Sequence, residues 1–301
     1  MKGTFELNEN FYSLGECNEC ALFCNLRQQC KSEKARVYIG ALHSYHRITY
    51  MGERRCYHER IMQSHTSPDQ YLSAVSDTMA QNHMLLPWLG NLAQPKVCLP
   101  QKMTAVLCHN RCFIGYRFFH NVGGGANASI YCMLRTLERI KEQEGKLPET
   151  FYYQVDGGSE NSNLATLGMC ELLIARRVVD KIVITRLMVG HTHCDIDAFF
   201  GVIWKKIRDS TILTPQQYEE AIKDALKDVG IPIIIEDVFV VPDYQAYINP
   251  HLLDISQAFK LKYTKLQWIF EYIGFCEGCG LATRPLCEKC AEFPNGVKVK
   301  S

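Results

Sequence analysis

Three aspartates stand where a polypeptide chain could build a site for phosphodiester chemistry. Asp77 ends one short apolar run, Asp156 ends another, and Asp197 lies in the first turn of a stretch with helical spacing. Two divalent ions about 4 Å apart can stabilise both the attacking and the leaving oxygen of a phosphodiester. Carboxylate oxygens are the ligands that Mg²⁺ or Mn²⁺ prefers. We therefore predict Asp77, Asp156 and Asp197 as catalytic metal ligands.

The third acid has a close competitor in Asp195. On a helix these two residues point roughly 160° apart, so only one of them can face the other acids. Asp197 directly follows Ile196, which begins an apolar stripe, and integrase-type cores similarly place their third acid just after an apolar residue. Asp195 is expected to be the helix N-cap, although it stays a candidate cofactor-binding residue.

The elements around the acids must bring them together. Apolar and β-branched runs predict a strand at 71–77, a hairpin of 103–109 and 113–119 turned at Asn110-Arg111, and strands at 151–156 and 182–189. Helical spacing recurs over 129–144, 163–177 and from 195 onward. This order is typical of the ribonuclease H-like α/β fold, a mixed sheet flanked by helices. In such a sheet the first and fourth strands are neighbours, and the helix after the fifth crosses their ends.

The length of 301 residues and a hydrophobic content of 47% predict one main domain with smaller appendages. We expect a Cys/His-containing, mainly helical region over 1–70, the ribonuclease H-like core over 71–210, an appended α/β region over 211–275 and a zinc-knuckle-like C-terminus over 276–301. The net charge of +1 excludes a protein that coats DNA through a global basic excess. Any contact with nucleic acid must therefore come from a local patch.

Cysteine pairs predict structural zinc at both ends of the chain. The segment CEGCGLATRPLCEKC contains two C-x-x-C pairs separated by seven residues, which suits a tetrahedral Zn²⁺ site made of Cys276, Cys279, Cys287 and Cys290. Near the N-terminus, Cys17 and Cys20 could share zinc with His46. His43, Cys24 and Cys30 are alternative partners, and a helical hairpin with buried cysteines would explain the same pattern without metal.

Polar residues beside the acids are secondary candidates. Glu160 and Asn161 could support a metal or bind a phosphate, although a turn entering a helix explains them almost as well. His191 and His193 are expected to hydrogen-bond near the carboxylates. Their Gly-His-Thr-His string is similar to the last metal motif of metallophosphoesterases, but the Asp-x-His and Gly-Asn-His strings which that class needs are missing from the sequence.

Five strings of the chain resemble a domain family of uncharacterised function found in transposon-derived proteins of animals, oomycetes and other eukaryotes. The matching features are the Cys17-x-x-Cys20 pair, His46 followed by Glu53, Arg54, Arg55 and Tyr57, VSDTMAQNHMLLP (75–87), QVDGGSEN (154–161) and VGHTHCDIDAFF (189–200). The resemblance covers residues 11 to about 208. The family has Asp-Gly-Met where this chain has Asp77-Thr78-Met79, so the aspartate is kept. The resemblance implies a mobile-element origin and a nuclease or strand-transfer core.

We therefore expect a transposase- or integrase-like protein that cleaves or transfers DNA phosphodiester bonds with two Mg²⁺ or Mn²⁺ ions. The alternative is a catalytically inactive, domesticated DNA- or protein-binding module with the same fold. DNA is the expected partner, membrane attachment is not expected, and a homo-oligomer is left open. The sequence has no secretory signal and no long apolar run, so an intracellular protein is expected. A nuclear location is expected because the substrate is DNA.

Overall fold

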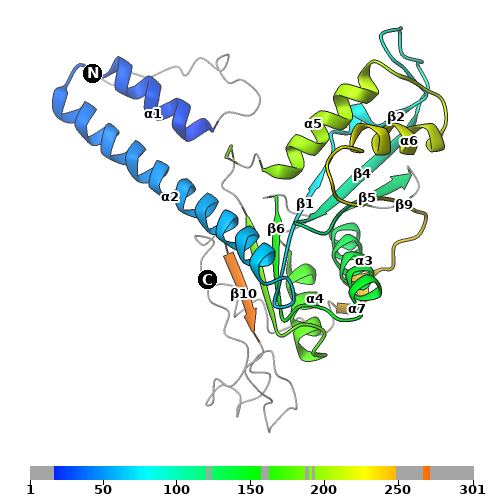
Figure 1. Cartoon of the computed structure of the whole chain (residues 1–301). Coiled ribbons are helices and arrows are strands. Elements are labelled where there is room, and N and C mark those ends of the chain that lie inside the picture. The colour runs from blue at the N-terminus through cyan, green and yellow to red at the C-terminus, as the bar shows by residue number, and fades with distance from the viewer. Residues whose placement is uncertain are drawn as a thin grey trace.

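The core of the protein is an eight-stranded mixed sheet (Figure 1). The structure is a computed structural model that describes residues 17–119, 122, 124–156, 163–186, 190–191, 194–248 and 267–271. Its strands lie in the order β10-β7-β6-β1-β4-β5-β9, and the short β2 pairs with β4 off this path. Their bounds are β1 Tyr71–Thr78, β2 Leu85–Leu86, β4 Leu99–Cys108, β5 Cys112–Phe119, β6 Thr150–Val155, β7 Lys181–Arg186, β9 Ile233–Val238 and β10 Gln267–Glu271.

The central five strands have the topology predicted from the sequence. β1 is antiparallel to β4, and β4 is antiparallel to β5, whereas β1 and β6, and β6 and β7, are parallel. The spatial order β5-β4-β1-β6-β7 is that of a ribonuclease H-like sheet, so the predicted fold class is confirmed. The β4–β5 hairpin turns at the predicted place, where Asn110 adopts a positive φ of 62° that asparagine tolerates better than most residues.

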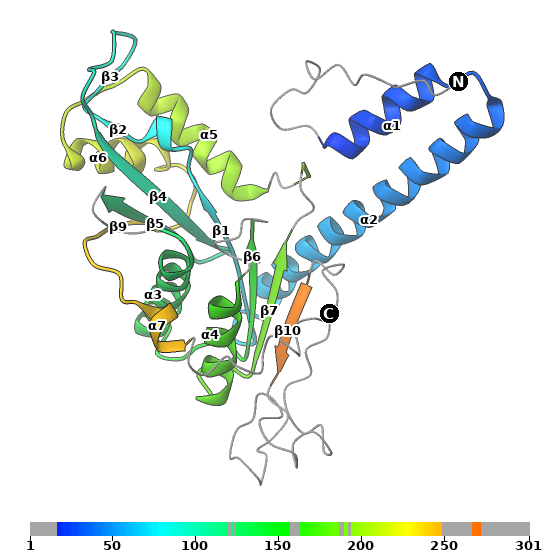
Figure 2. The same ribbon diagram turned by 180° about the vertical axis from the view of Figure 1, so that it is seen from behind.

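Helices cover both faces of this sheet. α3 (Ala126–Glu144), α4 (Leu164–Ala175) and α7 (Tyr244–Ile248) lie on one face, and α5 (Asp195–Arg208) and α6 (Pro215–Ala225) lie on the other (Figures 1 and 2). The sheet has a hydrophobic core on each face, and the side chains of β1 pack into the two cores alternately, because successive residues of a strand point to opposite faces. Leu72 and Ala74 pack with α3 and α4, whereas Val75 packs with α5 and α6.

The region after residue 210 contributes to the same sheet as the core. β9 pairs in parallel with β5 at one edge, and β10 pairs antiparallel with β7 at the other. Helix α6 begins directly after Thr214, whose hydroxyl caps it by accepting a hydrogen bond from the Gln217 backbone N–H. A separate two-stranded ladder joins β3 (Trp88–Leu89) to β8 (Thr211–Ile212), and a 3₁₀ turn, η1, covers Gln81–His83.

The N-terminal region is helical, as its sequence predicts. α1 (Asn18–Gln29) and the long α2 (Glu33–Thr66) form a hairpin that projects from the sheet (Figure 1). Among the described residues, the C-terminal part of α2 alone packs on the core, where Tyr57 is buried beside residues of β1 and α5. Within the described residues, no helix combines the length and the apolar character that a membrane crossing requires.

Candidate metal centre and carboxylate site

Four side chains from three separate segments meet where the helical hairpin approaches the core. Cys17 and Cys20 come from the start of α1, His46 from the middle of α2, and His191 from the segment before α5. Their ligand atoms all lie within 4.8 Å of one another. Within the residues that the structure describes, this is the only group of three or more such side chains whose ligand atoms lie that close together, so Asp77, Asp156 and Asp197 do not form one.

Three of the six distances between the four ligand atoms are close to those of a tetrahedral metal site. The Cys17 Sγ lies 3.3 Å from His46 Nε2, the Cys20 Sγ lies 3.5 Å from His191 Nε2, and the two Nε2 atoms are 3.2 Å apart. Bonds of about 2.0–2.1 Å to nitrogen and about 2.3 Å to sulfur place neighbouring ligand atoms about 3.3–3.8 Å apart. The cluster could therefore hold a metal ion with little movement.

Neighbouring groups orient both imidazole rings. The Glu19 carboxylate lies 2.7 Å from His46 Nδ1, the ring nitrogen that faces away from the cluster. The N–H at Nδ1 can therefore donate a hydrogen bond to Glu19. A carboxylate behind a ligating histidine fixes its tautomer and the orientation of its ring. Tyr50 stacks on His191 with the ring centroids 3.7 Å apart. Both rings thus present Nε2 to the same point.

The protonation states suit metal binding with proton release. Burial, together with the neighbouring Cys17, raises the pKa of Cys20 to about 11, so this thiol holds its proton at neutral pH until a metal displaces it. Burial also lowers the pKa of His191, and His46 and Arg54 add to this effect. His191 is therefore neutral at pH 7, which leaves a lone pair for an ion.

A glycine allows the His191 segment to approach α1 closely. Gly190 has a φ of +79°, and a Cβ atom built there would lie 2.5 Å from the Cα of Cys17. Backbone atoms at that distance cannot be avoided by a change of rotamer. The conformation and the space both require glycine at this position.

Gly190→Ala is therefore expected to separate His191 from Cys17 and to weaken metal binding by more than tenfold, with a lower melting temperature. A zinc-competition titration with a chromophoric chelator would measure the change. Gly201→Ala is the matched control, because nothing lies within 4 Å of a Cβ built at Gly201. Equal metal affinity in the two variants would show that the close approach of Gly190 and Cys17 is unimportant.

The predicted N-terminal ligands Cys17, Cys20 and His46 come together, and the structure identifies their partner. His191 was predicted to lie near the carboxylates, yet its ring completes the Cys/His group. The alternatives lie elsewhere: His43 stacks on Phe23, and neither Cys24 nor Cys30 is in the group. His191 belongs to the Gly-His-Thr-His string, but it lies 171 residues after Cys20. That separation is too long for a local motif to show that the two residues share a site.

Asp77 and Asp156 lie next to each other at the ends of adjacent parallel strands. Ser76 of β1 pairs with Val155 of β6, and each acid is the residue that follows. Asp77 points to the same face as Val75. Continuing the alternation of β6 by one residue places Asp156 on the face opposite Val155, which belongs to the α3–α4 core. Both carboxylates therefore face the side of the sheet that α5 covers.

The N-terminus of α5 approaches these acids. Its N-cap is Cys194, so the prediction that Asp195 is the N-cap was wrong. Asp197 occupies the third helical position, and its carboxylate accepts a hydrogen bond of 2.8 Å from the Cys194 backbone N–H. Burial raises the pKa of the Cys194 thiol to about 12, and the negative charges of Asp197 and Asp77 contribute. Cys194 thus lies within electrostatic reach of an acid from β1 and an acid from α5.

Asp195 points into a different, largely buried polar network. Its carboxylate lies 3.5 Å from His109 Nε2, and a hydrogen bond with His109 lowers the pKa of Asp195. The same nitrogen is 3.1 Å from the Tyr57 hydroxyl, and His109 Nδ1 is 3.0 Å from the Ser73 hydroxyl. The network links α2, β1, the end of β4 and α5. Sequence reasoning did not find His109, because a lone histidine after a strand carries no distinctive pattern.

Several predicted residues lie outside the described part of the chain. These are Glu160, Asn161 and His193 near the acids and the C-terminal set Cys276, Cys279, Cys287 and Cys290. The C-terminal zinc site therefore stays a prediction.

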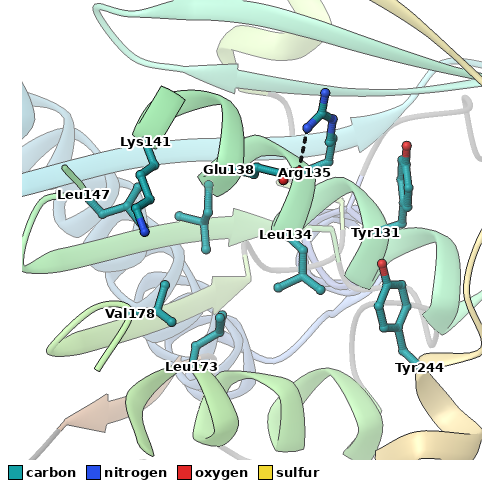
Figure 3. A pocket seen from close by; sticks show the side chains of 10 residues that line it. Tyr131, Leu134, Arg135, Glu138, Lys141, Leu147, Leu173, Val178 and Tyr244 are labelled. Carbon is teal, nitrogen blue, oxygen red and sulfur yellow. Dashed lines mark hydrogen bonds and ion pairs between the residues drawn. The ribbon is translucent and has the colours of Figure 1, made fainter. Parts of the chain in front are cut away.

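A pocket of about 400 Å³ lies between α3, α4 and α7, on the face of the sheet opposite to α5 (Figure 3). Leu134, Leu147 and Leu173 form part of its apolar lining, and the Arg135–Glu138 ion pair lies at its edge. It shares no residue with the Cys/His group or the acids.

Fold and site together define an α/β protein with a ribonuclease H-like sheet, acids at the ends of adjacent central strands and a Cys/His group that could hold a metal ion. A family model described as a domain of unknown function, DUF7869, matches residues 92–269. Because this match covers more than half of the chain, the protein belongs to the DUF7869 family. No curated protein matches the sequence.

Proposed function

We propose that the protein is a metal-dependent transposase- or integrase-like enzyme that cleaves or transfers DNA phosphodiester bonds. One observation carries this proposal. Asp77 and Asp156 follow paired residues on adjacent parallel strands and face the same side of the sheet. Hard carboxylate oxygens so placed suit Mg²⁺ or Mn²⁺, and such ions supply charge stabilisation to the two reacting oxygens.

Asp197 is the acid from α5 that we propose to complete this site. Its charge and that of Asp77 both act on the Cys194 thiol, whereas Asp195 is engaged by His109 and Tyr57. The hydrogen bond from the Cys194 backbone N–H fixes the Asp197 side chain at the helix N-terminus.

We further propose that the Cys/His centre holds structural zinc. Two thiolates and two imidazoles are a donor set that Zn²⁺ prefers, and four protein ligands leave no open position for a reacting water. The centre would fix the α1–α2 hairpin to His191, which lies only a few residues before Asp195 and Asp197. Zinc would thereby hold the segment that carries the third acid.

The α1–α2 hairpin supplies the local basic patch that DNA binding requires. Residues 18–66 contain eight Lys or Arg and four Glu, although the whole chain has a net charge of only +1. Arg36, Arg47 and Arg54 recur at intervals of 11 and 7 residues, which places them on one side of α2 within about 20°. Arg54 has an electrostatic effect on both His191 and Asp195, which supports a position of this side of the helix near the start of α5.

Arg47→Glu is expected to weaken binding to duplex DNA and to make it less dependent on salt. Each lost phosphate contact should reduce the slope of log K against log salt concentration by about 0.9. Fluorescence anisotropy at several salt concentrations would measure the slope. Lys227→Glu changes the charge equally at an exposed position after α6 and should leave the slope unchanged. An equal loss of DNA affinity in both variants would show that the hairpin is not the DNA-binding surface.

Incubation of the protein with labelled duplex DNA tests the proposed activity. We expect nicked, cleaved or joined products in Mn²⁺ or Mg²⁺ and none in a chelator. A folded protein that binds DNA but gives no product and binds no Mn²⁺ would instead be a domesticated binding module. The mobile-element origin and a nuclear location are part of the same proposal, since both follow from a DNA-transferring activity.

A further inference from the structure

One face of α2 carries a regular seam that is exposed to solvent. Residues at alternating intervals of four and three along this helix are Lys34, Tyr38, Ala41, Tyr45, Ile48, Gly52, Arg55 and Glu59. This is the spacing of the core positions of a coiled coil. The two central side chains are bulky and apolar, yet Tyr45 is 73% exposed and Ile48 is 71% exposed. A seam of this kind is typical of a helix that packs against another helix.

The seam points away from the other elements that the structure describes. His46, which joins the Cys/His group beside α1, and Tyr57, which packs on the core, lie on the other side of α2. A rotation of about 100° per residue puts these two residues roughly opposite the seam. The described part of the protein therefore stabilises α2 from one side and leaves the seam exposed.

The order of residues along the seam is complementary to its own reverse. If two copies of α2 cross antiparallel at a two-fold axis between His46 and Arg47, Tyr45 faces Ile48 of the second copy and Ala41 faces its Gly52. An antiparallel coiled coil requires this pairing of one core position with the other. The central layers of the coiled coil would then contain the large side chains of Tyr45 and Ile48, and the next layers on either side would contain the small residues Ala41 and Gly52.

Gly52 supports a close approach by another helix. Glycine inside a helix lowers its stability relative to alanine, but it leaves room for another backbone to come close. Within the described structure, nothing lies within 4 Å of a Cβ atom built at Gly52. The space that its missing side chain leaves faces the same direction as Tyr45 and Ile48.

Charge complementarity selects the antiparallel direction. The same two-fold axis places Lys34 opposite Glu59 of the second copy at each end of the seam. It also places Arg55 opposite Tyr38, where a guanidinium can lie against an aromatic ring. A parallel pair would instead bring Lys34 against Lys34 and Glu59 against Glu59, which is unfavourable.

We propose that two copies of this chain form a homodimer through an antiparallel pairing of α2, centred between His46 and Arg47. The proposal does not depend on the enzymatic activity, since it rests only on the exposed seam and its self-complementarity. In a dimer of this kind the two cores lie at opposite ends of the paired helices.

Sedimentation equilibrium of the full chain tests the dimer. Wild type is expected to have twice the mass of the monomer at micromolar concentration, and Tyr45→Glu with Ile48→Glu is expected to have the monomer mass. Val97→Glu is the control, because Val97 is 85% exposed and lies outside α2. Far-UV circular dichroism would verify that each variant is folded. A wild type that stays monomeric, or that pairs only with DNA or another protein, overturns the proposal.

A charge swap tests the direction of the pairing even if the double glutamate variant fails to fold. Lys34→Glu alone and Glu59→Lys alone should each weaken the dimer at least several-fold. The combination of both changes in one chain should restore wild-type dimerisation, because the swapped charges again face opposite charges. A combined variant at least as weak as either single variant would contradict the antiparallel arrangement.

Discussion

Cys20→Ser is expected to release one equivalent of zinc and to lower the melting temperature of the protein by about 10 °C. A metal present at about 1,000 times its dissociation constant stabilises the folded state by about 4 kcal/mol. Each kcal/mol corresponds to about 2–4 °C for a domain of this size. The loss should be large because the Cys/His group joins α1 and α2 to the core segment at His191.

Cys24→Ser is the matched control for this change. Cys24 lies in the same helix as Cys20, but it is exposed and outside the metal-binding group. Zinc analysis and thermal melts of the two variants, with and without a chelator, would compare them. If Cys24→Ser loses as much zinc and stability as Cys20→Ser, the ligand set identified here is incorrect.

Asp156→Asn is expected to reduce DNA cleavage or strand transfer by more than about 100-fold. Asparagine keeps the shape of aspartate but lacks the charge that a divalent ion requires. Loss even of an outer partner of a metal ligand costs about 10–100-fold, so loss of a ligand should cost more. Without metal the variant should be as stable as wild type or more stable, because removal of one charge relieves repulsion between neighbouring carboxylates.

Asp180→Asn provides the comparison for Asp156→Asn. Asp180 is exposed and directly precedes β7, at the end of that strand remote from the acids. This variant should retain wild-type activity and wild-type stabilisation by Mn²⁺. If Asp156→Asn retains activity and the same metal response, Asp156 is only a polar residue at a strand end.

The sequence predicted the central sheet because its strands and helices have distinct periods. The run at 71–77, the hairpin turned at Asn110 and the stripe that begins at Ile196 all fall in the expected elements. It predicted less well how the segment after residue 210 joins the sheet. The partner of β9 is β5, and a pairing between strands more than 100 residues apart leaves no local pattern.

The Cys/His group shows why the candidate site was only partly predictable. Cys17 and Cys20 form a recognisable pair, and His46 was among several histidines and cysteines that could join them. The fourth member, His191, lies 145 residues after His46 in the chain. Its role depends on the tertiary packing of the hairpin and on the close approach that Gly190 permits. Neither is visible in the spacing of residues.

Direct titration of the metal-free protein with Mn²⁺ tests the central claim, that Asp77, Asp156 and Asp197 form a site for divalent ions. Electron paramagnetic resonance distinguishes free from bound Mn²⁺ and would count the sites. We predict saturable binding in wild type and in Asp180→Asn, and a loss of that binding in both Asp77→Asn and Asp156→Asn while zinc remains bound. Equal Mn²⁺ binding by all four proteins, or none by wild type with its fold intact, would contradict the proposed carboxylate site.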